Sequence, residues 1–443
     1  MVSAAEQLAA NLNFSALAKA DELKKRIWFT LGALLVYRLG TYIPLPGIDP
    51  AAWEQIFQTQ SGGILGMFNM FAGGGIHRMA IFALNIMPYI SASIIVQLMT
   101  TVSPTLEQLK KEGEQGRKMI NQYTRYGTVI LAAVQSYGIA IGLQGTGSVV
   151  ADPGIFFILS TVITLTGGTM FLMWLGEQIT ARGIGNGISL IILSGIVAQL
   201  PTALAGTLEL SRQGALTAGA LLIVAVMAVS VIAFIVFMER AQRRLLIQYP
   251  KRQVGNRMFE GQSSHLPLKL NTSGVIPPIF ASSLLLLPTT VAGFNLGHMP
   301  DWLNTIVAQL SHGRPLYLII YVALILFFAF FYTAIVFNPT ETADNLKKHG
   351  GFNPGIRPGE RTAEYIDYVL SRITLIGALY LAAVCLFPEM LISYFSVPFY
   401  FGGTSLLIVV SVTMDTVAQV QGYLLAHQYE GLIKKSKLRG RRR

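Results

Sequence analysis

The sequence carries little charge for its length. Only 12% of its 443 residues are Asp, Glu, Lys or Arg, whereas 52% are hydrophobic. Soluble domains contain about 25% charged residues, so this composition excludes an ordinary soluble protein. The chain must use lipid as its solvent. At roughly 20 apolar residues per membrane-spanning helix, its length can hold about ten spans and leave half of the chain for loops.

Cysteine is almost absent, and the apolar segments contain few ionisable residues. Cys385 stands alone, so no disulfide can form within the chain, and no Cys/His cluster predicts a metal. A proton-coupled transporter needs an acidic or His site inside the membrane, and an intramembrane enzyme needs a nucleophile and base or metal ligands. Neither pattern is present, because Glu177 and Asp415 lie at or towards segment ends and Arg38 is isolated. We expect no catalysis and no cofactor, and we expect Arg38 to form a buried ion pair or to snorkel.

Apolar and polar segments alternate along the chain. Lys and Arg number 28 in the alternate segments that include both termini and 3 in the other set, and Arg38 and Arg125 lie inside spans. Because cytoplasmic loops collect positive charge, we predict an all-α polytopic protein with both termini in the cytoplasm. Ten transmembrane helices divide into halves at 27–205 and 206–425, which predicts two inverted five-helix halves around a central pore. The expected spans are 27–43, 80–102, 124–143, 154–176, 184–205, 215–238, 272–293, 315–337, 373–395 and 402–425.

Two glycine-rich segments have distinct interpretations. The segment 62–75 is apolar, too short to span the membrane and on the outer side, so it is either a re-entrant helix or an interfacial helix on the outer leaflet. The run RGIGNG at 182–187 has the glycines of a phosphate-binding loop, but it lies between two spans and follows no strand. We interpret that run as a tight turn with close helix packing.

The polar segment 338–372 has the signals of a structured loop. Asn338 can cap a short helix that starts at Pro339 and ends near Gly350. The turn sequence NPG and a second PG pair then leave Arg357 at a rigid, exposed tip before a helix begins near Glu360. A solvent-exposed charge that only sets the orientation of the chain in the membrane does not require this geometry. We therefore predict that Arg357 is a docking contact.

The polar segment 239–270 and the tail 426–443 are strongly basic. In 239–270, basic and apolar residues alternate, which is compatible with an extended hairpin. Such patches attract RNA phosphate, acidic protein surfaces or anionic phospholipids, and the sequence does not decide among them. The basic residues of the hairpin are Arg240, Arg243, Arg244, Lys251, Arg252, Arg257 and Lys269.

Several motifs in order resemble the SecY/Sec61-alpha family of protein-conducting channels, and the likeness extends from the first span to the tail. The motifs are PLPGI at 44–48, MPYISAS at 87–93, QYTRYG at 122–127, GIGNG at 183–187, FNPTETADNL at 337–346, PGIRPG at 354–359 and PFYFGGT at 398–404.

The resemblance implies a clamshell around an hourglass pore in the bacterial cytoplasmic (inner) membrane. Segment 62–75 would be the plug, with Ile64, Leu65, Met67, Phe68, Asn69, Met70 and Phe71. The pore ring would be Ile86, Ile90, Ile188, Ile192, Ile279 and Ile408. The lateral gate, between the second and seventh spans, would include Ser91, Gln122 and Asn271, and we expect Pro88, Pro277 and Pro278 to bend its two helices.

The resemblance also implies partners, because a passive channel needs an energy source from outside. These are the SecE and SecG membrane subunits, the SecA motor, the translating ribosome, and signal sequences with their nascent polypeptides. The motor and the ribosome would dock on 239–270 and 338–372, at Arg357, Arg243, Arg244, Lys251, Arg252 and Arg257.

Overall fold

The computed structural model describes residues 20–60, 69, 72–145, 149–213, 218–249, 252–254, 257–259, 263–293, 309, 314–395 and 403–440. The chain divides into two compact units. Unit 1 is Met1–Leu204, Leu286–Val307 and Val412–Arg443, and unit 2 is Ala205–Leu285 and Ala308–Ser411. Each unit has its own packing, described separately below.

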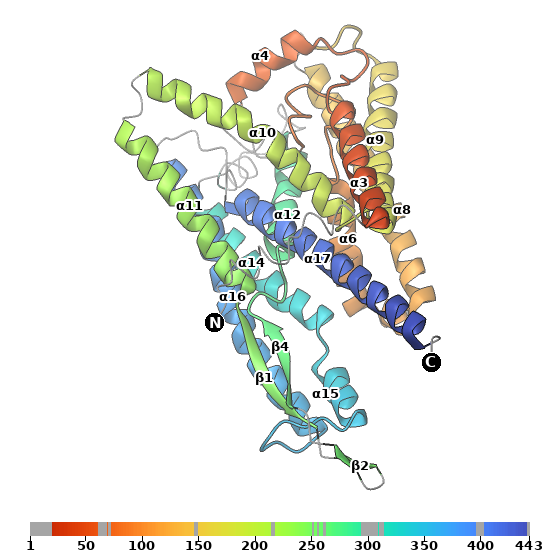
Figure 1. Cartoon of the computed structure of the whole chain (residues 1–443). Coiled ribbons are helices and arrows are strands. Elements are labelled where there is room, and N and C mark those ends of the chain that lie inside the picture. The colour runs from red at the N-terminus through yellow and green to blue at the C-terminus, as the bar shows by residue number, and fades with distance from the viewer. Residues whose placement is uncertain are drawn as a thin grey trace. The chain divides into compact units, whose positions relative to one another are not determined.

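The described chain is mainly helical (Figure 1). Up to residue 212 the helices are α3 (Asp21–Gly40), α4 (Pro50–Gln60), α6 (Met87–Val102), α7 (Pro104–Lys111), α8 (Glu114–Gly145), α9 (Ile155–Arg182) and α10 (Gly187–Arg212). Thereafter come α11 (Ala218–Arg240), β1 (Gln242–Gln248), β2 (Arg252–Val254), β3 (Arg257–Phe259), β4 (Ser263–Lys269), α12 (Ile276–Gly293), α14 (Pro315–Val336), α15 (Pro339–Lys348), α16 (Glu360–Phe395) and α17 (Gly403–Gly440).

In unit 1, α8 and α9 pack against each other, α6 packs against both, and α3 lies along α9. Small residues allow the close approach. A Cβ atom at Gly168 of α9 would lie 2.3 Å from the carbonyl oxygen of Ile81, too close for any side chain. Because lipid gives little hydrophobic force between helices, such close backbone contacts are a main source of helix association in a membrane.

The start of α6 corrects one predicted span. Residues 80–102 were expected to form one apolar helix, but the helix begins only at Met87. The preceding residues form turns, and Met79 and Asn85 have positive φ angles of 43° and 49°. Pro88 therefore lies in the first turn of α6, where a missing N–H costs no hydrogen bond.

In α12, as in α6, the prolines lie at the start of the helix. Pro277 and Pro278 are its second and third residues, so they help to begin that helix. The expectation that these prolines bend the helices is wrong, because a proline kinks a helix only where it removes an interior hydrogen bond.

In unit 2, an antiparallel pair of strands extends from the end of α11 (Figure 1). The register of β1 and β4 runs from Gln242 opposite Lys269 to Gln248 opposite Ser263. Leu245 and Ile247 alternate with exposed residues and are buried, and Leu245 packs with Ile366 and Ile373 of α16. The predicted extended hairpin is confirmed, with β2 and β3 forming a second antiparallel pair.

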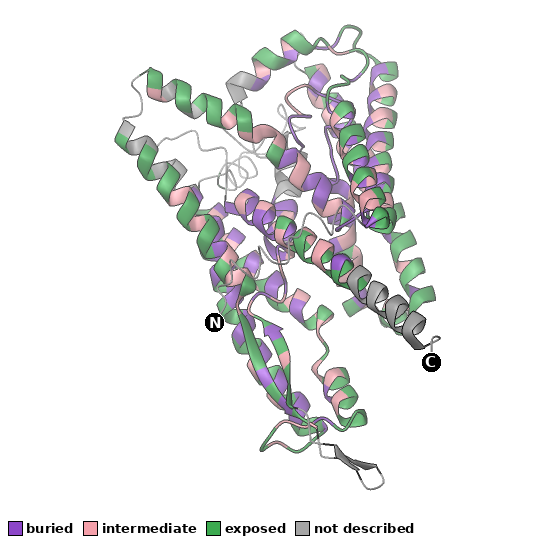
Figure 2. Ribbon diagram, in the orientation of Figure 1, coloured by how far each residue is buried: buried purple, intermediate pink, exposed green. Residues whose placement is uncertain are grey.

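Large apolar side chains remain exposed along the helices (Figure 2). On α9, for example, Phe156 is 86% exposed and Ile163 is 70% exposed. Such surfaces would aggregate in water, whereas lipid solvates them. Six helices in the described part of the chain are long and apolar enough to cross a membrane, or seven if α6 and α7, which meet at a 98° bend, count as one span.

Candidate functional site

The six isoleucines of the predicted pore ring lie in or at the start of α6, α10, α12 and α17. Ile86 is the N-cap residue of α6, and the backbone N–H of Ile90 donates to its carbonyl oxygen over 3.1 Å. Ile188 and Ile192 both lie in α10. Each of these two pairs is therefore spaced by about one helical turn and shares a helix face, as predicted from the sequence.

Four of the six side chains are buried, and the other two are partly buried. Ile86, Ile90, Ile192 and Ile408 are buried, and Ile188 and Ile279 are partly buried. Gly176 of α9 lies opposite Ile188, because a Cβ atom there would approach Cγ1 of Ile188 to 3.1 Å. These side chains offer no hydrogen-bond donor or acceptor to an ion.

Most of the predicted plug lies outside the described residues, namely Ile64, Leu65, Met67, Phe68, Met70 and Phe71. Asn69 is described. Its carbonyl oxygen accepts hydrogen bonds from Nε2 of Gln199, at 2.8 Å, and from the N–H of Gly74, at 2.9 Å, while its Oδ1 accepts from the N–H of His77 at 2.8 Å. The bond from Gln199 attaches Asn69 to α10 of the same unit.

Arg38 contacts the last residues of the segment 62–75. Its Nη1 atom donates to the carbonyl oxygen of Gly73 and to Oγ1 of Thr41, and its Nη2 atom donates to the hydroxyl of Tyr42 over 3.1 Å. These partners are a carbonyl and two hydroxyls rather than a carboxylate. Of the two expected roles, a buried ion pair or a snorkelling side chain, these contacts include no ion pair, and one of the neutral partners, Gly73, lies within the segment 62–75.

The predicted gate residues have different environments. Ser91 is buried in α6. Gln122 is exposed on α8, where its Nε2 donates to the hydroxyl of Tyr126 over 2.9 Å. Both belong to unit 1, whereas Asn271 belongs to unit 2.

Asn271 is the centre of a hydrogen-bond network before α12. Its Nδ2 donates to Oε1 of Glu239, at 2.7 Å, and to the carbonyl oxygen of Gly274, at 3.1 Å. Its Oδ1 accepts from Oγ of Ser273 at 3.1 Å, and Asn271 is only 4% exposed. Sequence reasoning missed Glu239. The signal was present, because Glu239 is the one acidic residue of the segment that forms α11.

An ion pair joins α8 to α9. The Arg125 guanidinium contacts both carboxylate oxygens of Glu177, with Nη2 at 2.9 Å from Oε1 and at 2.8 Å from Oε2. The two side chains are 48% and 33% exposed. The pairing was not predicted, although opposite charges near the same ends of two consecutive spans are a signal for it.

The tip at Arg357 is built as the sequence predicts. Oδ1 of Asn338 accepts from the N–H groups of Thr340 and Glu341, which caps α15. Gly355 and Gly359 have φ angles of 85° and 108°, which a side chain would strain. Arg357 is exposed between them.

An open cavity of about 500 Å³ adjoins this tip. Arg361 and Glu364 lie on its wall, 4.0 Å apart. Thr362 Oγ1 donates to the carbonyl oxygen of Arg357 over 2.9 Å, which fixes the tip to the start of α16. The lining residues are Gly355, Ile356, Arg357, Arg361, Glu364, Tyr365 and Tyr368.

The basic residues of the hairpin lie along its strands. Arg243 and Arg244 are exposed on β1. Arg252 is opposite Phe259 and Arg257 is opposite Val254 in the β2–β3 register. Lys251 lies outside the described residues.

The glycine run at 183–187 is a packing turn, as predicted. The N–H of Ile184 donates to Oγ1 of Thr30, and the N–H of Gly185 donates to Oε1 of Gln419. A Cβ atom at Gly187 would lie 2.0 Å from the carbonyl oxygen of Gly176. Its N–H groups are thus directed to protein side chains instead of a phosphate.

Comparisons with known proteins agree with one another. The sequence model of the SecY family matches residues 80–417. The protein translocase subunit SecY of Escherichia coli K12 is 57% identical over 430 residues, covering 96% of this chain and 97% of the relative. The corresponding subunit of Rickettsia bellii is 54% identical over 433 residues, covering 97% and 100%.

Solved structures share the fold at low sequence identity. A solved protein-conducting channel superimposes with a TM-score of 0.66 at 18% identity, covering 90% of this chain and 92% of that one. Sec61 in the canine ribosome–channel complex from the endoplasmic reticulum has a TM-score of 0.63 at 17% identity, with coverage of 90% and 92%.

Proposed function

The chain belongs to the SecY family of protein translocase subunits, and we propose that it is the central pore-forming subunit of a Sec translocon. It is a multi-pass membrane protein and a channel, not an enzyme. It conducts unfolded polypeptides across the bacterial inner membrane and releases transmembrane segments sideways into lipid. The observation that carries this proposal is the 57% identity to a translocase subunit over 96% of the chain.

We propose ten transmembrane helices in two inverted halves, with both termini in the cytoplasm. The charge imbalance supports this orientation, since Lys and Arg number 28 on one side and 3 on the other. The basic hairpin β1–β4 and the Arg357 tip then face the cytoplasm. The division of the apolar segments into five and five supports the inverted repeat.

The proposed barrier is the ring of six isoleucines. A channel for unfolded chains must accept every type of side chain, so specific polar sites would retain some sequences. It must still refuse ions, and an apolar constriction does so because it dewets and offers no substitute for the hydration shell. The burial of the apolar side chains of Ile86, Ile90 and Ile192 supports this role.

The proposed plug is the segment 62–75. Two of its described residues accept hydrogen bonds from other parts of unit 1, Asn69 from Gln199 and Gly73 from Arg38. A neutral hydrogen bond such as that from Gln199 contributes about 0.5–1.5 kcal/mol, and one from a charged guanidinium such as Arg38 contributes about 1.5–3 kcal/mol. A plug attached in this way can leave the pore when a polypeptide enters and can return afterwards.

The proposed lateral gate lies between α6 and α12. Interhelical hydrogen bonds in membranes are worth about 0.6 to 2 kcal/mol, so a seam held by polar side chains opens at little energetic cost. Asn271 and Ser91 lie at or near the starts of these helices.

We propose SecE and SecG as membrane subunits, and SecA and the translating ribosome as cytoplasmic partners that supply energy. The capped helix α15, the rigid tip and the adjacent cavity support docking at Arg357, because together they hold one guanidinium in a fixed position. Arg243 and Arg244 add positive charge on β1, which suits acidic protein, ribosomal RNA or anionic phospholipid.

Two experiments test the function. Purification under mild conditions with mass spectrometry should recover a SecE-like protein, whereas a small-solute transporter would be recovered alone. A panel of paired cysteines on α6 and α12, in a Cys385→Ser background, should give a disulfide that stops translocation until reductant is added. Normal translocation by fully cross-linked protein would contradict the lateral gate.

A further inference from the structure

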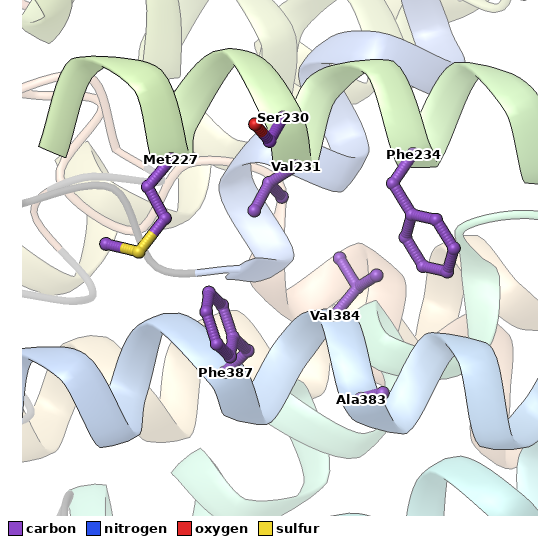
Figure 3. A pocket seen from close by; sticks show the side chains of 7 residues that line it. All are labelled: Met227, Ser230, Val231, Phe234, Ala383, Val384 and Phe387. Atoms are coloured by element: carbon purple, nitrogen blue, oxygen red, sulfur yellow. The ribbon is translucent and has the colours of Figure 1, made fainter. Parts of the chain in front are cut away.

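A groove lies between α11 and α16 in unit 2. It has a volume of about 330 Å³ and is lined by Met227, Ser230, Val231, Phe234, Ala383, Val384 and Phe387. Figure 3 shows these side chains facing one another from the two helices. The Ser230 hydroxyl donates to the carbonyl oxygen of Val226 over 2.8 Å, so even this side chain offers no free donor. The occupant of the groove must be apolar.

A proline follows the residues with which α16 lines the groove. Pro388 lies inside the helix, and it lacks the N–H that would bond to the carbonyl oxygen of Val384 on the groove wall.

An exposed stripe on α16 leads from the groove to a basic residue. Leu375, Ile376 and Leu379 are 47%, 51% and 54% exposed. With Ala383 and Phe387, they recur every three or four residues and occupy one helix face. Arg372 is exposed at the end of this stripe, and its neighbour Ile373 packs with Leu245 of β1 and Leu268 of β4.

Arg372 is available to an anion. Its guanidinium lies 4.3 Å from the ring centroid of Tyr368, which orients it. Within the described residues it has no ion-pair partner. The side chain is therefore a fixed positive charge at one end of an apolar track.

The dimensions match one leaflet of a bilayer. At 1.5 Å per residue, Ala383 and Phe387 lie about 16 and 22 Å from Arg372 along the helix. Half of a bilayer, with its headgroup region included, is about 20–22 Å thick. A lipid with its headgroup at Arg372 thus places the ends of its acyl chains at the groove.

The charge at the end of the apolar track favours a lipid as the occupant. An acyl chain is apolar, as the lining of the groove requires, and an anionic headgroup on the same molecule would complement the exposed guanidinium of Arg372. We therefore infer that α16 and α11 form a binding site for an anionic phospholipid, with its phosphate at Arg372 and one acyl chain between Phe387 and Phe234.

The inference depends on the placement of the chain in a membrane but not on translocation, so its test measures binding alone. The purified complex is placed in phosphatidylcholine nanodiscs that contain, in equal fractions, brominated phosphatidylglycerol or brominated phosphatidylcholine. Tryptophan fluorescence of a Phe387→Trp variant reports an acyl chain in the groove, and the parent protein supplies the background of the four native tryptophans. Met227→Trp is the second reporter.

We expect phosphatidylglycerol to quench this fluorescence with about fivefold preference over phosphatidylcholine, the ratio given by ~1 kcal/mol per basic residue near the surface. Adding Arg372→Gln should remove the preference. Arg361→Gln removes a positive charge from the first turn of the same helix, further from the groove, and should retain the preference. A Phe156→Trp variant on α9 should show equal quenching by both lipids, because Phe156 is 86% exposed and simply faces solvent lipid.

Two results would overturn the inference. Equal quenching by both lipids in the Phe387→Trp variant would show that no headgroup is recognised. Absence of quenching in both reporters, while a Leu379→Trp variant is quenched, would show that protein fills the groove, from a second copy or from a partner helix.

Discussion

Asn271 donates a hydrogen bond of 2.7 Å to the carboxylate of Glu239 and thereby joins the turn before α12 to the end of α11. Because Asn271 is 4% exposed, this bond to a charged group is shielded from water, and such bonds contribute about 1.5–3 kcal/mol. The residue that the sequence assigns to the gate is therefore held within its own unit. Movement of α12 relative to α11 would therefore have to break this hydrogen bond, or α11 would have to move together with α12.

Substitution of Asn271 by Leu should shift the gate towards opening. The change removes the donor to Glu239 and leaves the protein able to fold, because only one network is lost. We expect increased secretion of proteins with defective signal sequences, measured in cells as exported reporter. Thr272→Val is the matched control, since Thr272 bonds to Lys269 and not to Glu239. Equal secretion by the Leu variant and the parent would contradict a role of Asn271 in the gate.

The ion pair of Arg125 and Glu177 should contribute modestly to stability. Both side chains are partly exposed, so solvent screens the pair, and we expect a coupling of about 0.5–1 kcal/mol. A double-mutant cycle with Arg125→Ala and Glu177→Ala, read from thermal unfolding in detergent, measures this coupling. Arg125→Lys should restore only part of it, because an ammonium does not form the bidentate contact. If the effects of the two single substitutions on stability add up to the effect of the double substitution, the two side chains are not coupled.

Polar substitutions in the isoleucine ring should raise the resting ion conductance. Ile408→Ser or Ile192→Ser would wet the constriction and lower the barrier to ions. Single-channel recordings in planar bilayers measure the effect. Ile163→Ser is the control, because Ile163 is 70% exposed on α9. If ring variants, alone and combined, conduct no more than this control, the barrier lies elsewhere.

Charge reversal at the tip should block motor-driven translocation. Arg357→Glu replaces a fixed guanidinium by a carboxylate and should abolish binding to an acidic partner surface, while membrane assembly remains intact. Translocation into inverted vesicles with added motor is the measurement. Lys348→Glu applies the same charge change in the last turn of α15. Full activity of the Arg357 variant would rule out this contact.

Loss of the helix cap at Asn338 should loosen the loop that presents Arg357. Asn338→Ala removes the acceptor for two N–H groups and should destabilise α15 by about 1 kcal/mol. Hydrogen exchange of α15 should become roughly fivefold faster, which is the ratio that corresponds to this energy. Asn338→Asp keeps an acceptor and should keep the protection. Unchanged exchange in the Ala variant would show that packing alone holds α15.

Local signals in the sequence predicted much of this protein. The low charge and long apolar segments predicted a multi-pass membrane protein, because lipid excludes unpaired polar groups. Asn338, Pro339 and the glycines near Arg357 predicted a capped helix and a rigid tip, since caps and turns depend on a few adjacent residues. The i to i+4 spacing placed Ile188 and Ile192 on one helix face for the same reason.

Tertiary structure decided the features that depend on residues far apart in the chain. The pairs Arg125–Glu177 and Asn271–Glu239 form only when separate segments meet, and no local pattern specifies which charges will meet. The delayed start of α6 depends on the turns at 80–86 and on their contact with Gly168 of α9. The sequence determines which segments enter the lipid, because insertion depends on the summed transfer free energy of the side chains in each segment. Packing between segments determines where each helix begins and which partners its few polar groups contact.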